Sequence, residues 1–250
     1  MKKHLSVLML AARSSVFKVL ALLLLAAGLE GLALWLTLAR SSSWSCPVSL
    51  EGLIESSHIG WIMAAALVLL TAILCLTGCE FGSKQGYTLR RLRVSERSVF
   101  FWQSAYNAVC LLGFWAVQTG VALAFSAWYA ANAPAGEVTG QTVFLAFYRS
   151  GLLHSLLPLS DWLRWLGNLL ALLGLALASA QFPVRQRRGG WGKGVVFMLV
   201  FTIALFDRDM GSTGSDGVLI GLSFLVIVSA VLGVLHLDED EREEEQHEKA

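Results

Sequence analysis

Long runs of apolar residues, each about as long as a membrane-spanning helix, most constrain how this chain can fold. A helix needs about 20 predominantly apolar residues to cross the hydrocarbon core of a bilayer. Four stretches meet this requirement clearly: Val19–Ala39, Ile59–Cys79, Trp165–Val184 and Gly217–Leu237. With 56% hydrophobic and 15% charged residues, the chain is also too apolar for a soluble domain. We therefore expect an all-α integral membrane protein.

Two further stretches are candidates for crossings. Val99–Ala131 is uncharged and longer than one crossing needs, which indicates tilt or an extension beyond the membrane. Gly189–Phe206 spans only if Lys193 reaches the interface with its long side chain. We predict six transmembrane helices, at about 19–39, 59–79, 99–131, 165–184, 189–206 and 217–237.

The distribution of basic residues favours one orientation of these helices. Leaving aside the C-terminal tail, the segments on the predicted inner side hold thirteen Lys and Arg residues, and those on the outer side hold four. Because cytoplasmic segments are enriched in Lys and Arg, both termini are predicted to be cytoplasmic. Arg13 and Lys18 interrupt the first apolar run, so we expect a short interfacial helix before the first span rather than a cleaved signal. The expected location is a bacterial cell membrane, with several crossings.

Two segments outside the predicted spans have their own patterns. A crossing by Gln141–Leu159 would move the Arg185–Lys193 cluster outside, so residues 141–159 are predicted to be an outer interfacial or re-entrant helix. Its role, as a lid or a docking surface, stays open. From His236 to Ala250 the chain has eight acidic and two basic residues. Such a run predicts a disordered acidic cytoplasmic tail over residues 238–250.

Patterns typical of catalysis or metal binding do not occur in this sequence. Cys75 and Cys79 share a helix face, but no nearby His or further Cys completes a tetrahedral site, so we interpret them as packing residues. Gly189–Gly194 resembles a phosphate loop, but Gly follows its Lys where Ser or Thr should bind magnesium. No zinc-protease helix or Gly-x-Ser-x-Gly turn is present. We expect no enzymatic activity, no cofactor or metal and no nucleic-acid partner.

Two polar features lie within the predicted spans. Glu30 falls in the first span, where burying a carboxylate costs about 3 kcal/mol unless it is protonated or paired. Five residues of the third span share one helix face: Gln103, Asn107, Cys110, Phe114 and Gln118. This face is predicted to point into the bundle or toward a second subunit rather than toward lipid. Two roles stay open, lining a substrate path or holding helices together, for Glu30, Gln103, Asn107 and Gln118.

The polar stretch between the second and third spans, Phe81–Arg97, holds five basic residues and is predicted to be cytoplasmic. We call it the bridge. It contains one or two predicted helical turns with Leu89 and Leu92 on one side, followed by a helix start that Ser95 can cap. A basic loop that only sets topology and binds anionic lipid headgroups would carry the same charge. The residues predicted to contact a partner protein are Tyr87, Thr88, Leu89, Arg90, Arg91, Leu92, Arg93, Val94, Ser95, Glu96 and Arg97.

In layout and in the bridge, the chain resembles the permease subunits of type-2 ABC transporters, most of which are exporters. The sequence Thr88-Leu-Arg-Arg-Leu-Arg-Val-Ser95 is similar to that family's short helix followed by Leu-Pro-Val/Ile-Ser. Arg93 stands where Pro is frequent in the family, which is a small departure. The resemblance implies six membrane helices, an interfacial N-terminal helix and a cytoplasmic coupling helix between the second and third spans.

The same resemblance implies partners. A separate cytoplasmic ABC ATPase would bind ATP and magnesium and contact Tyr87–Arg97. A second permease subunit, identical or related, would complete the substrate path within the membrane lipid. The alternative is a non-transport membrane protein, such as a sensor, an assembly factor or an accessory subunit, whose basic loop only sets topology. An intramembrane enzyme is a third possibility.

Overall fold

The computed structural model describes residues 2–41, 49–78, 96–132, 140–187, 192–206, 217–218 and 220–233. Over these ranges the chain is all-α, without strands. The helices are α1 (Lys2–Ser41), α2 (Leu50–Ser56), α3 (Ile59–Gly78), α5 (Glu96–Asn132), α6 (Gly140–Arg149), α7 (Gly151–Leu156), α8 (Trp162–Arg187) and α9 (Lys193–Phe206), followed by the helical segment Ile220–Gly233. The acidic tail predicted over residues 238–250 lies outside the described residues.

Four helices are long and apolar enough to cross a membrane. Their apolar parts are Ala12–Arg40, Ile59–Thr77, Arg97–Asn132 and Trp162–Gln186, which coincide with the first four predicted spans. The last two predicted spans coincide with α9 and the Ile220–Gly233 segment. Both are apolar helices, but over the described residues they are shorter than the about 20 residues that a crossing requires.

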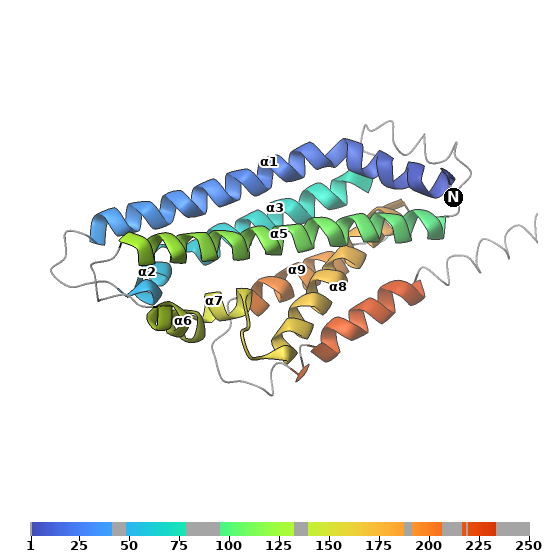
Figure 1. The fold of residues 1–250 in the computed structure, drawn as a ribbon. Helices are drawn as coiled ribbons and strands as arrows, with labels where there is room; N and C mark the ends of the chain where they lie inside the picture. The colour runs from blue at the N-terminus through green and yellow to red at the C-terminus, as the bar shows by residue number, and fades with distance from the viewer. Residues whose placement is uncertain are drawn as a thin grey trace, which may run out of the picture.

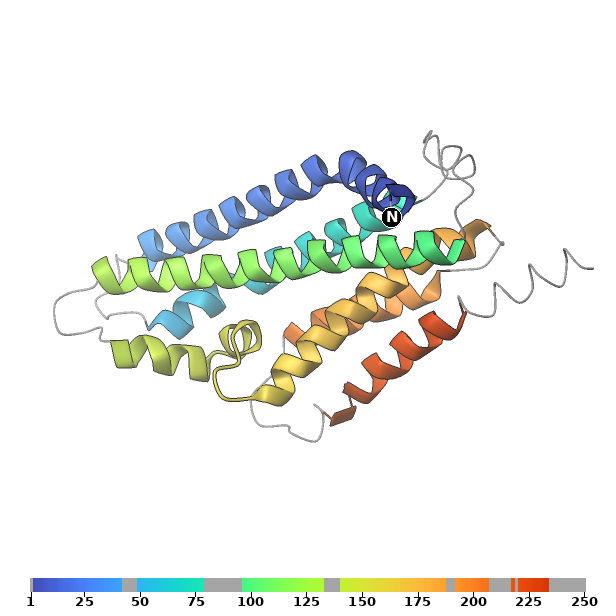
Figure 2. The same cartoon turned by 45° about the vertical axis from the view of Figure 1, so that its right-hand side comes forward.

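The long helices form a bundle in which α1, α3 and α5 lie side by side (Figure 1). α8 packs against α3, α5 and α9, as the turned view in Figure 2 also shows. Between these helices lies a core of fully buried leucines, among them Leu70, Leu111 and Leu175. Large apolar side chains such as Phe17 and Val109 point outward instead. An outer surface of this kind suits a lipid environment, since lipid tails are as apolar as these side chains.

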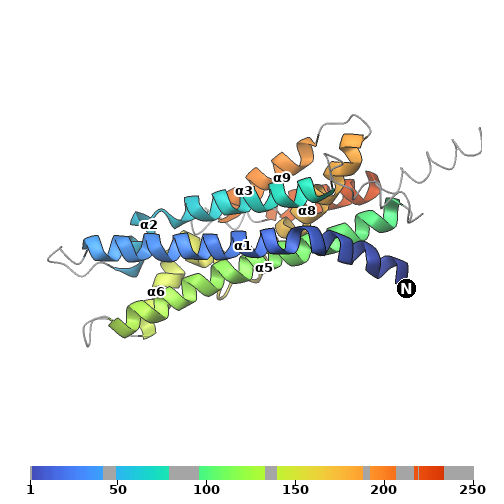
Figure 3. The ribbon, with the colours of Figure 1, turned by 90° about the horizontal axis from the view of Figure 1, so that it is seen from above.

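The N-terminal residues are part of the first long helix. The sequence predicts a separate short helix before the first span, but Lys2–Ser41 is a single helix, which bends near its N-terminal end (Figure 3). No Gly or Pro interrupts the chain between Lys2 and Ala27, so nothing in the sequence stops helix propagation there.

One end of the bundle carries three short helices, α2, α6 and α7 (Figure 1). The predicted outer segment 141–159 is helical but divided, because Ser150 adopts an extended conformation between α6 and α7. α2 is not predicted by the sequence analysis. It begins at a cap in which the hydroxyl of Ser49 accepts a hydrogen bond from the backbone N–H of Gly52, at 3.3 Å.

Candidate functional site

The bridge lies mostly outside the part of the chain that the structure describes. Tyr87–Ser95 belongs to the undescribed residues, whereas Glu96 and Arg97 form the first turn of α5. The described part of α5 begins with Glu96, and the cap predicted at Ser95 lies outside the described residues. The C-terminal end of α3 and the N-terminal end of α5 lie at the end of the bundle where α1 begins (Figure 1). The bridge therefore connects two helix ends on this side of the molecule.

Glu30 and Gln118 come together in the bundle interior. Glu30 on α1 is 0% exposed and Gln118 on α5 is 2% exposed. The Gln118 amide lies beside the Glu30 carboxylate. The geometry falls short of a direct hydrogen bond, because both carboxylate oxygens and Nε2 of Gln118 are without a bonding partner among the described residues. These two predicted residues therefore form one buried polar pair.

A small cavity of about 20 Å³ adjoins this pair. That volume has room for one water molecule. Apart from Glu30 and Gln118, the described residues that line it are apolar: Leu34, Ile54, Ile59, Met63, Val121, Ala122, Phe125, Leu152, Leu153 and Leu156. We call this space the inner cavity. Two polar side chains in an apolar shell could hydrogen bond to one such water molecule.

Gln103 and Asn107 lie on the same face of α5 as Gln118, but Asn107 meets α8. All five residues of the predicted polar face are buried, which confirms that this face points into the bundle. Nδ2 of Asn107 donates a hydrogen bond of 2.9 Å to the hydroxyl of Ser179 on α8. Nε2 of Gln103 has no hydrogen-bond partner in the described part of the chain. For Asn107 this geometry favours a contact between helices over a place beside Glu30.

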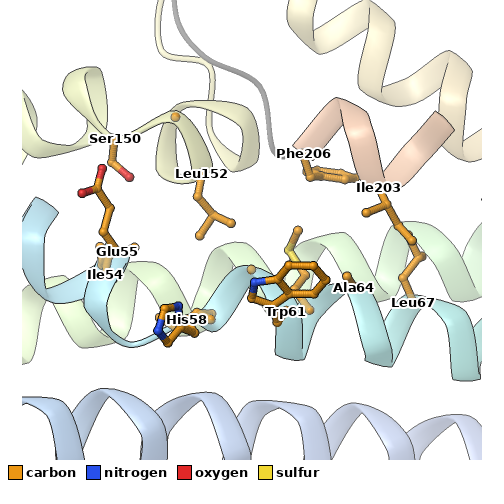
Figure 4. Close-up of a pocket in the computed structure, with 14 residues that line it drawn as sticks. Ile54, Glu55, His58, Trp61, Ala64, Leu67, Ser150, Leu152, Ile203 and Phe206 are labelled. Atoms are coloured by element: carbon orange, nitrogen blue, oxygen red, sulfur yellow. The ribbon is translucent and has the colours of Figure 1, made fainter. Parts of the chain in front are cut away.

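A larger pocket, not predicted from the sequence, opens between the α2–α3 turn, α7 and α9 (Figure 4). Its volume is about 320 Å³. We call it the outer pocket. Leu152 from α7 and Phe206 from α9 approach it from one side, and Trp61 and Leu67 of α3 lie opposite (Figure 4). Its lining residues are Ile54, Glu55, His58, Ile59, Gly60, Trp61, Met63, Ala64, Leu67, Ser150, Gly151, Leu152, Ile203 and Phe206.

The turn between α2 and α3 positions the polar residues of the outer pocket. His58 has a φ of 53°, in the left-handed region that non-glycine residues rarely adopt. This turn brings His58 and Glu55 to the pocket, and the carboxylate of Glu55 points toward Ser150 (Figure 4). In the sequence, the Ser49 cap and the acidic Glu51 in the first turn were the available signals for α2.

The wall formed by α7 is held to the bundle by side chains of α5 and α8. The indole N–H of Trp115 donates to the carbonyl of Leu156 at 3.0 Å, and that of Trp165 donates to the carbonyl of Pro158 at 2.6 Å. The buried His154 lies 3.1 Å from Asp161, measured from Nε2 to Oδ2. These contacts fix the segment that carries Leu152, so both cavities have a defined wall.

The outer pocket and the inner cavity are neighbours. Four residues line both spaces and therefore form a partition between them: Ile54, Ile59, Met63 and Leu152. Gly60 allows α3 to lie close to Leu152, because a Cβ at position 60 would be only 3.3 Å from Cδ1 of Leu152.

Comparison with known proteins adds no assignment, since the chain matches no family model, no curated protein and no solved structure.

Proposed function

We propose that this chain is the permease subunit of an ATP-driven ABC transporter, working as an exporter in a bacterial cell membrane. A separate cytoplasmic ATPase would bind the bridge, and a second permease subunit, identical or related, would complete the substrate path. Both termini would be cytoplasmic. α9 and the Ile220–Gly233 segment would supply the last two of six crossings.

The observation that supports this proposal best is the position of α5. It begins at Glu96, within the bridge, and continues as one helix of 37 residues. At 1.5 Å per residue, Gln118 lies about 33 Å along this helix from Glu96. If α5 moves as one rigid element, a displacement of its first turn would reach the polar pair at Glu30.

The proposed mechanism assigns separate tasks to the two ends of α5. ATP binding would close the ATPase dimer, and this closure would shift the bridge together with the attached ends of α3 and α5. Glu30 and Gln118 would then change their exposure and line part of the substrate path. The resemblance of Thr88–Ser95 to a coupling helix supports the first task. The burial of Glu30 and Gln118 supports the second, since a buried carboxylate in a membrane helix commonly marks a ligand or ion path.

The test is replacement of the apolar residues of the bridge. We expect the double variant Leu89→Asp/Leu92→Asp to insert into the membrane normally and to lose the ATPase that co-purifies with the tagged chain in mild detergent. The matched control is Arg90→Gln/Arg91→Gln, which removes charge from the same segment and keeps both leucines.

Two results would contradict the proposal. One is vanadate-sensitive ATPase activity that co-purifies equally with the original chain and with the leucine variant. The other is the absence of any ATPase from the original preparation. A changed orientation of the arginine variant, with the leucine variant unaffected in every respect, would indicate a loop that only sets topology.

A further inference from the structure

The outer pocket has the size and lining of a site for a small organic molecule. Its volume of about 320 Å³ falls within the range of roughly 300–1,000 Å³ that is typical of such sites. Met63 and Leu67 are buried and form its apolar floor on α3, and Phe206 adds an aromatic side chain from α9. A ligand that fills this space must therefore have a hydrophobic body.

The charge at the edge of this pocket is negative. Glu55 is exposed, and its carboxylate forms no ion pair or hydrogen bond with the residues that the structure describes. Glu51, one turn earlier in α2, differs because its Oε1 lies 4.0 Å from Nη1 of Arg149. His58 adds an exposed imidazole next to Glu55. Among the described residues that line the pocket, none is Lys or Arg.

The inner cavity adds a second acidic side chain near the outer pocket. Behind the partition lies Glu30, a second carboxylate with no basic residue among the described residues that line the inner cavity. The two spaces thus place one carboxylate at the edge of an apolar pocket and another behind its wall. Both carboxylates favour a positively charged ligand over a negatively charged one.

We propose that the outer pocket binds an amphipathic organic cation, with its hydrophobic body against α3 and α9 and its charged head at Glu55 and His58. This inference goes beyond the proposed function, because such binding needs no ATPase. In a transporter, the outer pocket would be one binding site along the transport path for this class of substrate. The partition that includes Leu152 would separate the bound cation from Glu30.

The experiment measures binding to the full chain in lipid nanodiscs by equilibrium dialysis, with empty nanodiscs subtracted. The probe is radiolabelled trimethyl(4-phenylbutyl)ammonium, and 5-phenylpentanoate provides a similar hydrophobic body with a negative charge. We expect saturable binding of the cation only. Glu55→Gln should weaken it roughly two- to fivefold, the upper part of the range for losing one exposed ion pair.

Two further variants test whether the cation binds in the outer pocket itself or only responds to the charge of α2. Ala64→Trp, which fills the pocket, should abolish saturable binding of the cation. Glu51→Gln removes the neighbouring carboxylate on the same helix outside the pocket lining, and it should leave binding unchanged. Absence of saturable cation binding, equal binding of the carboxylate probe, or equal weakening by Glu51→Gln and Glu55→Gln would overturn the proposal. None of these results depends on whether an ATPase partner exists.

Discussion

The carboxylate of Glu30 lies beside the amide of Gln118, across the contact between α1 and α5, and both side chains are almost fully buried. The residues around them are apolar, and neither carboxylate oxygen is hydrogen bonded within the described ranges. A carboxylate in such a place destabilises the fold relative to a neutral side chain. This cost is the reason for proposing a role for Glu30 in the substrate path.

Neutralising this carboxylate should make the protein more stable. We expect Glu30→Gln to raise the free energy of unfolding by about 1–2 kcal/mol, because a neutral amide is less costly to bury than a charged carboxylate. For a chain of this size, each kcal/mol corresponds to roughly 2–4 °C in Tm. Thermal unfolding in detergent measures the effect, and the exposed Glu55→Gln is the matched control. A lower Tm for Glu30→Gln would mean that the carboxylate has a stabilising partner.

The sequence was sufficient to predict which face of α5 is buried. Amides within a membrane helix need partners away from lipid, and the 3.6-residue period places Gln103, Asn107 and Gln118 on one face. Periodicity does not say which neighbouring helix each residue meets. α5 is long enough to contact both α1 and α8, so Asn107 faces Ser179 while Gln118 faces Glu30.

The outer pocket could not be predicted in the same way. Its lining comes from α2, α3, α7 and α9, and the side chains from α3 and α9 are apolar residues of the kind that also face lipid. α2 has only seven residues, too few for a hydrophobic period to stand out, and its sequence signals are confined to the Ser49 cap and the acidic Glu51 in its first turn. The break at Ser150 puts Leu152 on a separate short helix. Ser150-Gly151 is a local turn signal, but it does not show which helices α7 then contacts.

The hydrogen bond of Trp165, near the start of α8, should stabilise the wall of the outer pocket that α7 forms. Trp165→Phe removes the hydrogen bond to the carbonyl of Pro158 and keeps an aromatic ring, so we expect a loss of about 1 kcal/mol in unfolding free energy. Amide exchange in residues 151–157 should become faster, measured by mass spectrometry. The matched control is Trp162→Phe on the same helix, at a position that is 69% exposed. Equal effects of the two variants would exclude a specific role for the Trp165 bond.

The bond between Asn107 and Ser179 should appear as an energetic coupling between α5 and α8. In a double-mutant cycle with Asn107→Ala and Ser179→Ala, we expect a coupling energy of about 0.6 kcal/mol, with an upper value near 1.7 kcal/mol. The measurement is reversible unfolding of the four proteins in mixed micelles. A second cycle that pairs Asn107→Ala with Thr202→Ala on α9 serves as the control and should be additive. Additivity in both cycles would contradict an energetic coupling through this hydrogen bond.

Gly174 faces the side chain of Met198 across the contact between α8 and α9. A Cβ at this position would lie 2.6 Å from Cε of Met198, which is itself completely buried. We expect Gly174→Ala to cost about 1 kcal/mol, because displacing the Met198 side chain in a packed core outweighs the gain in helix propensity from Gly to Ala. Gly167→Ala, on the same helix, is the control because its Cβ would meet Cγ1 of Ile220 at an ordinary 3.7 Å. If thermal unfolding shows equal losses for the two variants, packing against Met198 is not the cause.

The partition between the two cavities should control access to the polar pair. In a variant without the native cysteines, we expect Gln118→Cys to react slowly with N-ethylmaleimide, because position 118 lies behind Leu152. Adding Leu152→Ala should increase the rate by opening the inner cavity toward the outer pocket. The matched control is Leu153→Ala, since Leu153 lines only the inner cavity of these two spaces and its truncation enlarges that cavity without removing the partition. If Leu153→Ala accelerates labelling as much as Leu152→Ala does, loosened packing rather than the partition governs access to Gln118.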